Sequence, residues 1–327
     1  MDKPEHSFMS ALRILGINPM VAALIMMFVF LSGIMIGLWI KNAAKKPALR
    51  PQPAKERREI QEPAPEDIKV PEEKEAPEEN PEPAKPETAT PTQFIRNALA
   101  MPDGANPPLA AIIIDDMGID MARSNRILMI DAPLTVSYMP HAPNLQAQID
   151  TARSKGKEAM LHVPMEAMSS AYANDYGPEY LKTTESRQTN ARLLREMLER
   201  ANGYVGVNNH MGSKFTLDEG QMSGVLEELA RRGLAFIDSK TAATSLGPIA
   251  RHLKMPFLER DVFLDDSNEP EDIKARFADL ERIAKKRGWA VAIGHPREAT
   301  IKALAEWLDK ESGVIVVPVS YIITKYD

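Results

Sequence analysis

The chain has 327 residues, of which 44% are hydrophobic and 26% charged, and it contains no cysteine. This length allows a sizeable core, while the lack of cysteine excludes a disulfide framework, a thiolate zinc site and a cysteine nucleophile. The net charge is +4 over residues 1–50, −6 over residues 51–92 and −4 over residues 93–327. Because the last part has no excess of cations to neutralise phosphates, nucleic acid is not expected as a partner.

Residues 20–40 form an uncharged apolar run that predicts a transmembrane helix. At a rise of about 1.5 Å per residue, this run would measure ~30 Å, the thickness of a bilayer core. The apolar region of a cleaved signal peptide is about half as long, so an uncleaved signal anchor is the preferred interpretation. Residues 1–19 then form a short cytoplasmic segment.

Residues 41–92 are rich in proline, glutamate and alanine. A segment of this composition buries too little apolar surface to offset its chain entropy, so it is predicted to be disordered. At ~3.1 Å per residue, an extended proline-rich linker of this length could reach on the order of 100 Å. It separates the membrane helix from a globular domain over residues 93–327.

The globular part alternates short apolar runs with longer amphipathic runs. Strands are expected over residues 109–114, 134–138, 158–163, 204–207, 234–237, 262–264, 289–293 and 314–317, and helices over residues 119–130, 144–155, 189–201, 218–232, 270–287 and 298–310. Several strand runs are apolar on both faces, as a parallel sheet covered by helices requires. The pattern predicts an α/β fold with a distorted (β/α)7–8 barrel. No G-x-G-x-x-G follows the first strand, which argues against a nucleotide cofactor.

Polar residues gather where these strands end. They are Asp115, Asp116, His162, Glu166, Asn208, Asn209, His210, Asp238, Asp265 and His295. A single histidine after a strand is usually structural, and an aspartate there often caps a helix. In a parallel barrel, however, all carboxyl ends of the strands meet on one face, so these groups are expected together. Imidazoles with one carboxylate bind Zn²⁺ or a similar ion and support metal-assisted hydrolysis.

Six segments in this order carry a resemblance to a known family. AIIIDDMG, KGKEAMLHVPME, GVNNHMGSKFT, FIDSKTAATS, DVFLDD and AIGHP resemble the divergent polysaccharide deacetylases, from about residue 109 to residue 319. The resemblance implies the fold of the NodB-like carbohydrate esterases, a distorted barrel that removes acetyl groups from polysaccharides with a divalent metal. It also implies Asp115 as the catalytic base, Asp116 as the first metal ligand and His295 as the group that assists the leaving group.

The sequence departs from the broader fold at two places. Glu166 stands where a second metal-binding histidine is expected, and residues 208–212 (NNHMG) replace an Arg-x-Pro-Tyr loop. The expected ligands of the metal, taken to be Zn²⁺, are therefore Asp116, His162 and His210. Glu166 is the alternative ligand or a partner of a ligand. The remaining polar residues are expected to contact substrate or to support the ligands, and they are Asn208, Asn209, Asp238 and Asp265.

The function expected from the resemblance is a membrane-anchored, metal-dependent deacetylase of peptidoglycan or another envelope glycan. Such a substrate and the long linker favour an inner-membrane anchor with the globular domain in the periplasm. The cations that follow the span, at Lys41, Lys45, Lys46 and Arg50, argue for the opposite orientation by the positive-inside rule. The alternative function is a non-catalytic envelope module that binds glycan or a cell-wall partner protein through the same cleft.

Overall fold

The computed structural model describes residues 93–100, 108–172 and 175–326. The predicted cytoplasmic segment (1–19), transmembrane helix (20–40) and linker (41–92) lie outside these residues. Within the described ranges, no helix is both long enough and apolar enough to cross a membrane.

The centre of the domain is one parallel sheet. Its strands are β1 (Leu109–Met117), β2 (Thr135–Tyr138), β3 (Glu158–Met165), β4 (Gly206–Met211), β5 (Ala235–Asp238), β6 (Phe257–Glu259), β7 (Val262–Phe263), β8 (Trp289–Gly294) and β9 (Ile315–Val316). They lie in the order β6-β5-β4-β3-β2-β1-β8-β7, with β9 also paired to β1. All of the strand pairs are parallel. The predicted parallel α/β architecture is confirmed.

The two ends of the strand order meet in a single segment. β6 pairs with β5, whereas β7, which follows after two residues, pairs with β8. Between them, the backbone N–H of Arg260 donates to Asp238 O at 3.0 Å and that of Asp261 donates to Val291 O at 2.9 Å. The sheet is therefore curled, as expected for a distorted barrel. The sequence predicted β7 but missed β6, because three residues carry too little periodicity to be recognised.

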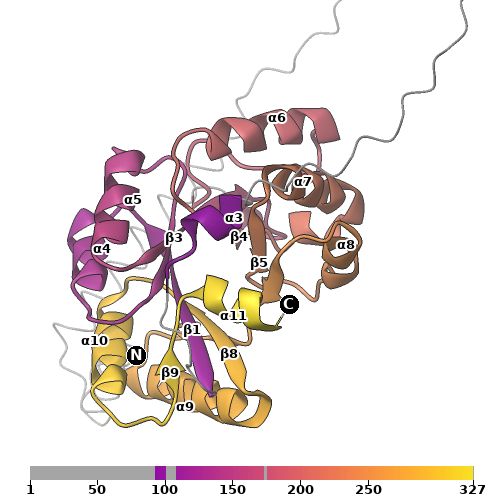
Figure 1. Ribbon diagram of the computed structural model, residues 1–327. Coiled ribbons are helices and arrows are strands. Elements are labelled where there is room, and N and C mark those ends of the chain that lie inside the picture. The colour runs from indigo at the N-terminus through magenta and orange to yellow at the C-terminus, as the bar shows by residue number, and fades with distance from the viewer. Residues whose placement is uncertain (1–92, 101–107, 173–174, 327) are drawn as a thin grey trace, which may run out of the picture. The chain divides into compact units, whose positions relative to one another are not determined.

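Helices surround this sheet (Figure 1). They are α4 (Met121–Leu128), α5 (Leu145–Ser154), α6 (Arg187–Leu198), α7 (Glu219–Arg232), α8 (Gly247–His252), α9 (Pro270–Arg287) and α10 (Glu298–Leu308), and 3-10 turns lie at Ser170–Tyr172 and Phe215–Leu217. All of these helices except the short α8 were predicted. Gly233 and Gly288 end α7 and α9 in the left-handed conformation, with φ of 64° and 96°.

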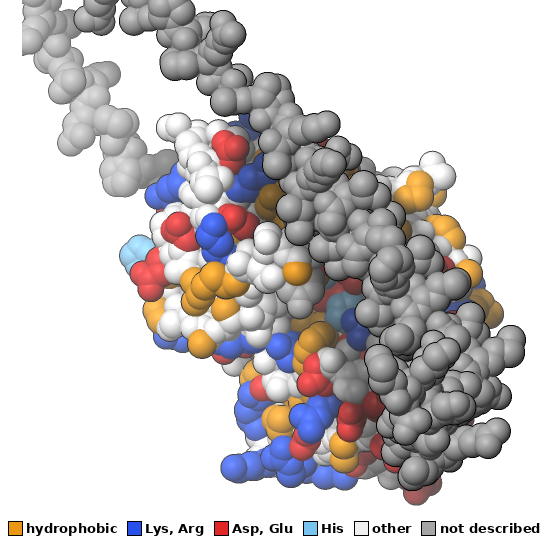
Figure 2. Space-filling view, turned by 180° about the vertical axis from the view of Figure 1, so that it is seen from behind, with side chains coloured by type: hydrophobic (Ala, Val, Ile, Leu, Met, Phe, Trp, Pro, Cys, Tyr) orange, Lys and Arg blue, Asp and Glu red, His pale blue; other side chains and the backbone are white. Residues whose placement is uncertain are grey.

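On the described part of the face opposite to that in Figure 1, cations and carboxylates are interspersed among hydrophobic side chains (Figure 2).

The inside of the curled sheet is filled with apolar side chains. Leu109, Ile113 and Val291 belong to this inner core, while Ala110, Ile112 and Ile114 of β1 belong to a second core that includes the surrounding helices. The inner core also contains Phe94 of α3 (Gln93–Asn97) and Ile322 of α11 (Val319–Tyr326), two helices that the sequence did not predict. These helices lie in the middle of the view in Figure 1. Polar residues occupy the opposite, carboxyl end of the strands.

Candidate active site

The inner face of the sheet changes from apolar to polar at the carboxyl ends of its strands. Side chains alternate between the two faces of a strand, so Asp115 follows Ile113 on the inner face of β1. By the same alternation, His162 follows Met160 on β3, and His295 follows Ile293 just beyond β8. The sequence order of apolar and polar residues therefore determines which groups meet above the inner core.

Asp116 joins this set through an irregular backbone. Its φ is 54°, in the left-handed region, and the β1–β2 register is interrupted between Ile114 and Met117. A non-glycine residue in this region costs roughly 1 kcal/mol or more. On a regular strand, consecutive side chains would point to opposite faces, but the irregularity lets Asp115 and Asp116 both approach the histidines.

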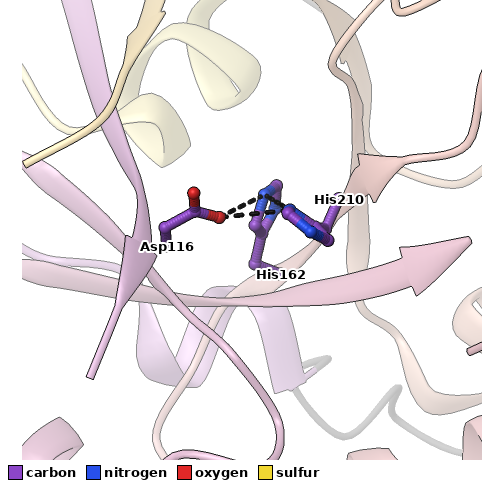
Figure 3. Close-up of side chains that lie close together, drawn as sticks. All are labelled: Asp116, His162 and His210. Carbon is purple, nitrogen blue, oxygen red and sulfur yellow. Dashed lines mark hydrogen bonds and ion pairs between the residues drawn. The ribbon is translucent and has the colours of Figure 1, made fainter. Parts of the chain in front are cut away.

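Asp116, His162 and His210 present one ligand atom each to a common point (Figure 3). Asp116 Oδ1 lies 3.1 Å from His210 Nδ1 and 3.5 Å from His162 Nε2, and the two nitrogens are 3.2 Å apart. Around a tetrahedral Zn²⁺ with bonds of about 2.0–2.1 Å, neighbouring ligand atoms are separated by about 3.3 Å. Asp116 Oδ1 is also buried and accepts no hydrogen bond from the described residues. This donor set fits a divalent metal such as zinc.

Hydrogen bonds orient both imidazoles toward Asp116. His162 Nδ1 donates to Asn208 Oδ1 at 2.9 Å, and His210 Nε2 donates to the backbone oxygen of Asp175 at 3.0 Å. These acceptors leave the lone pairs on the nitrogens that face Asp116. Burial, reinforced by the charge of His210, lowers the pKa of His162 to about 3, so this imidazole is neutral at physiological pH. Neutral imidazole is the form that binds metals.

Asp115 is held by the same asparagine that orients His162. Asn208 Nδ2 donates to both carboxylate oxygens of Asp115, at 2.8 and 2.9 Å, while Ser137 Oγ donates to Asn208 Oδ1 at 2.6 Å. Burial raises the pKa of Asp115 to about 7, although the charge of His295 and the hydrogen bonds from Asn208 oppose this shift. A carboxyl with this pKa can accept a proton near neutral pH.

His295 is oriented by a second buried carboxylate, Asp265. His295 Nδ1 lies 2.9 Å from Asp265 Oδ1, and Asp265 Oδ2 accepts from the backbone N–H of His295 at 2.8 Å and from Thr300 Oγ1 at 2.7 Å. Burial alone would lower the pKa of His295, but the hydrogen bond to Asp265 and the charge of Asp116 outweigh it and raise the pKa. The other nitrogen, Nε2, lies 3.8 Å from Asp116 Oδ2. The raised pKa favours the protonated form of His295, whose Nε2 faces the three converging groups.

Residues 112–323 match the family model of divergent polysaccharide deacetylases. The chain belongs to this family. It is 32% identical over 220 residues to the uncharacterised protein YibQ of Escherichia coli K12, a match that covers 65% of this chain and 68% of that one. An uncharacterised protein of Haemophilus influenzae is 34% identical over 195 residues, covering 59% of this chain and 69% of its own.

Among solved structures, an uncharacterised protein of Agrobacterium tumefaciens C58 has the same fold. The TM-score is 0.65 at 26% sequence identity, and the match covers 71% of this chain and 95% of that one. The family assignment expected from the six segments is thereby confirmed. The Agrobacterium protein thus shares the fold of this chain, and the roles of individual residues follow from the geometry of the site.

Glu166, the alternative ligand considered for this deacetylase-family chain, lies apart from the converging groups. Its Oε1 lies 2.7 Å from Lys214 Nζ, and its Oε2 accepts from the backbone N–H and the hydroxyl of Thr183 at 2.7 and 2.6 Å. Both oxygens are thus occupied by protein donors. Glu166 connects the loops that follow β3 and β4. The spacing of motifs in the sequence does not predict this contact.

Asn209 and Asp238 also have partners within the loops. Asn209 Oδ1 accepts from the backbone N–H of Ser239 at 2.9 Å, and its Nδ2 donates to Met211 O at 2.8 Å. Asp238 Oδ1 accepts from the backbone N–H of Lys240 at 2.7 Å. Asn209 therefore makes no hydrogen bond to His210 and instead joins the backbone of Met211 to that of Ser239.

A cavity of about 640 Å³ opens beside Asp116, His210 and His295. Its wall also includes Arg297, which the sequence did not single out although it stands two residues after His295. Ser137, the donor to Asn208, was likewise missed because it lies inside an expected strand. A larger cavity, of about 840 Å³, lies along β6 and α8 at a distance from these groups in the fold. The cavity of about 640 Å³ is therefore the one through which a substrate could reach Asp116, His210 and His295.

Proposed function

We propose that the chain is a metal-dependent deacetylase that hydrolyses acetyl groups of an envelope polysaccharide. One observation carries the proposal: Asp115 and His295 lie beside the three converging groups, and a separate buried side chain holds each of them. Asn208 holds Asp115 and Asp265 holds His295. A hydrolase of this kind needs one group to accept a proton and another to donate one.

Asp116, His162 and His210 would hold the divalent ion, for which zinc is the expected identity. When bound, such an ion polarises the acetyl carbonyl and lowers the pKa of the attacking water. Family membership supports this assignment, as does the buried Asp116 oxygen that accepts no hydrogen bond from a described residue. Hydrogen bonds orient both histidines before the ion arrives, and burial keeps His162 neutral.

Asp115 accepts the proton of the attacking water in this proposal. Its pKa of about 7 gives it both proton affinity and a substantial ionised fraction near neutrality. His295 then gives the proton on Nε2 to the departing amine or alcohol as the bond from the carbonyl carbon to that atom breaks. The products are acetate and the deacetylated glycan. Asp265 keeps the other imidazole nitrogen engaged, so that His295 presents Nε2 to the substrate.

Acetate release from the full chain tests the proposal. The purified protein is loaded with Zn²⁺ or Co²⁺ and incubated with peptidoglycan, N-acetylated chitin oligomers and an O-acetylated glycan. We expect acetate from at least one substrate, and its loss in Asp115→Asn with the metal content unchanged. A protein that holds metal and binds these glycans without releasing acetate would instead be the non-catalytic binding module.

We also propose that residues 20–40 anchor the chain in the inner membrane with residues 93–327 in the periplasm. The uncharged run, the proline-rich segment after it and the polysaccharide substrate support this placement. A C-terminal fusion to alkaline phosphatase, which is active only after export, should be active in cells. An inactive phosphatase fusion together with an active cytoplasmic reporter at the same position would reverse the orientation.

A further inference from the structure

Arg297 is a half-buried cation on the wall of the cavity beside His295. Its Nη1 donates to the backbone oxygen of Asp265 at 2.5 Å and to Asn268 Oδ1 at 3.2 Å. Both acceptors are neutral. Within the described residues, Arg297 forms no ion pair with a carboxylate, so its positive charge is not balanced by a direct partner.

The other arginine of the cavity differs in this respect. Arg123 Nε lies 3.5 Å from Asp120 Oδ2 and 3.9 Å from Glu298 Oε1. Glu298, although it follows Arg297 directly in the chain, lies 2.6 Å from Arg126 Nη1. Asp120 and Glu298 are thus directed toward Arg123 and Arg126, and Arg297 lines the cavity without either of them.

Arg297 is also fixed in orientation. Its backbone N–H donates to His295 O at 2.8 Å, and its backbone oxygen accepts from Ile301 at 2.9 Å in the first turn of α10. The guanidinium is held at one end by the two bonds from Nη1, whereas Nε and Nη2 donate to no residue in the described ranges. An arginine held in this way can offer two parallel N–H groups to an anion and loses little side-chain entropy on binding.

We propose that Arg297 binds an anionic substituent of the glycan, a carboxylate or a phosphate, close to the acyl group that is removed. The proposal rests on the deacetylase function and narrows its substrate to an acidic polysaccharide. Because Arg297 lies on the same wall as His295 and only two residues beyond it, the anion belongs to the acetylated sugar itself. A neutral polymer would leave the charge of Arg297 without a partner.

Binding to three sugars of matched core tests this inference. N-acetylglucosamine is neutral, N-acetylmuramic acid adds a carboxylate, and N-acetylglucosamine 6-phosphate adds a phosphate. Their dissociation constants are measured by nuclear magnetic resonance titration of the zinc-loaded full chain carrying Asp115→Asn, which prevents turnover. We expect at least one charged sugar to bind roughly tenfold to a hundredfold more tightly than the neutral one. The charged sugar that binds more tightly identifies the preferred anion as a carboxylate or a phosphate.

Variants of the two cavity arginines complete the experiment. Arg297→Gln should abolish the preference for the charged sugar and leave N-acetylglucosamine binding unchanged, whereas Arg297→Lys should retain part of it. Arg123→Gln, the matched control, should keep the preference. Equal binding of all three sugars, no binding at all, or an equal loss in Arg123→Gln would overturn the inference. A charged-sugar preference that depends on Arg297, found without acetate release from any glycan, would uphold the anion site and reject the deacetylase function.

Discussion

Buried carboxylate oxygens occur at both ends of the curled sheet, but only at the carboxyl end does one of them lack a hydrogen-bond donor among the described residues. At the amino end, Glu158 begins β3 and is fully buried. Its oxygens accept from Thr135 Oγ1 at 3.2 Å, from Ser320 N at 3.1 Å and from Leu99 N at 3.3 Å, and the Ser320 hydroxyl donates as well. At the carboxyl end, Asp116 Oδ1 is buried without accepting a hydrogen bond from any described residue. The paired oxygens of Glu158 serve the fold, whereas the unpaired oxygen of Asp116 is available to a ligand.

The pKa shifts by themselves would not separate the two ends. Burial raises the pKa of Asp115 near the site and also that of Glu158 at the amino end. What differs is access, because Asp115 adjoins Asp116, which lines the cavity, whereas Glu158 is enclosed by α11 and the segment after α3. Functional assignment therefore depends on the access of a buried acid to the cavity more than on its proton affinity.

The largest effect expected is on turnover at the carboxyl end. Asp115→Asn removes the proton acceptor and should lower kcat about a thousandfold, since general-base catalysis contributes on the order of 10²–10⁴. The zinc content, measured by mass spectrometry, should stay the same. Asp272→Asn on the exposed face of α9 is the matched control and should leave kcat unchanged. Wild-type turnover in Asp115→Asn would assign the base to another residue.

The corresponding change at the amino end should act on stability alone. Glu158→Ala leaves the donors of Thr135, Ser320 and Leu99 without their acceptor, so the free energy of unfolding in urea should fall by about 3 kcal/mol. Metal content should not change. Glu271→Ala, at a side chain that is 84% exposed, should have little effect on stability. A loss of metal in Glu158→Ala at full stability would contradict the division between the two ends.

Asn208 offers a test within the site, because its side-chain oxygen accepts from His162 and its side-chain nitrogen donates to Asp115. Asn208→Asp keeps an oxygen for His162 Nδ1 but loses the N–H groups that hold Asp115, whereas Asn208→Ala loses both. We expect zinc affinity, measured by titration calorimetry, to fall roughly tenfold to a hundredfold in Asn208→Ala and to change little in Asn208→Asp. Turnover should fall in both variants. Equal losses of zinc affinity would mean that the oxygen does not orient His162.

The smallest effect expected is the pH dependence of stability at the amino end. The folded pKa of Glu158 is raised above its ordinary value of 4.5, so the folded chain binds this proton more tightly than the unfolded chain. The resulting stability is complete below the unfolded pKa and is lost as the pH rises through the folded pKa. Wild type should therefore lose stability relative to Glu158→Gln as the pH increases above about 4.5. A difference that grows in the opposite direction would show that Glu158 is stabilised as an anion.

The sequence by itself determined the parallel α/β fold and the set of groups at the carboxyl ends of the strands. Both are local patterns: strands such as 109–114 and 289–293 are apolar on both faces, and the first polar residue after each of them falls at a place set by strand length. The convergence of Asp116, His162 and His210 could be anticipated because parallel strands deliver their ends to one face.

Only the tertiary structure decided what each polar residue contacts. Asn208 joins Asp115 and His162, which lie 93 and 46 positions away in the chain, and Glu166 pairs with Lys214 at a separation of 48. No local pattern encodes such pairs, because they depend on the register between strands and on the paths of loops. The left-handed backbone of Asp116 has no sequence signal either, since its cost is offset by contacts that form only in the folded chain. Strand ends therefore predict which chemical groups meet, and packing determines which of them remain open to a ligand.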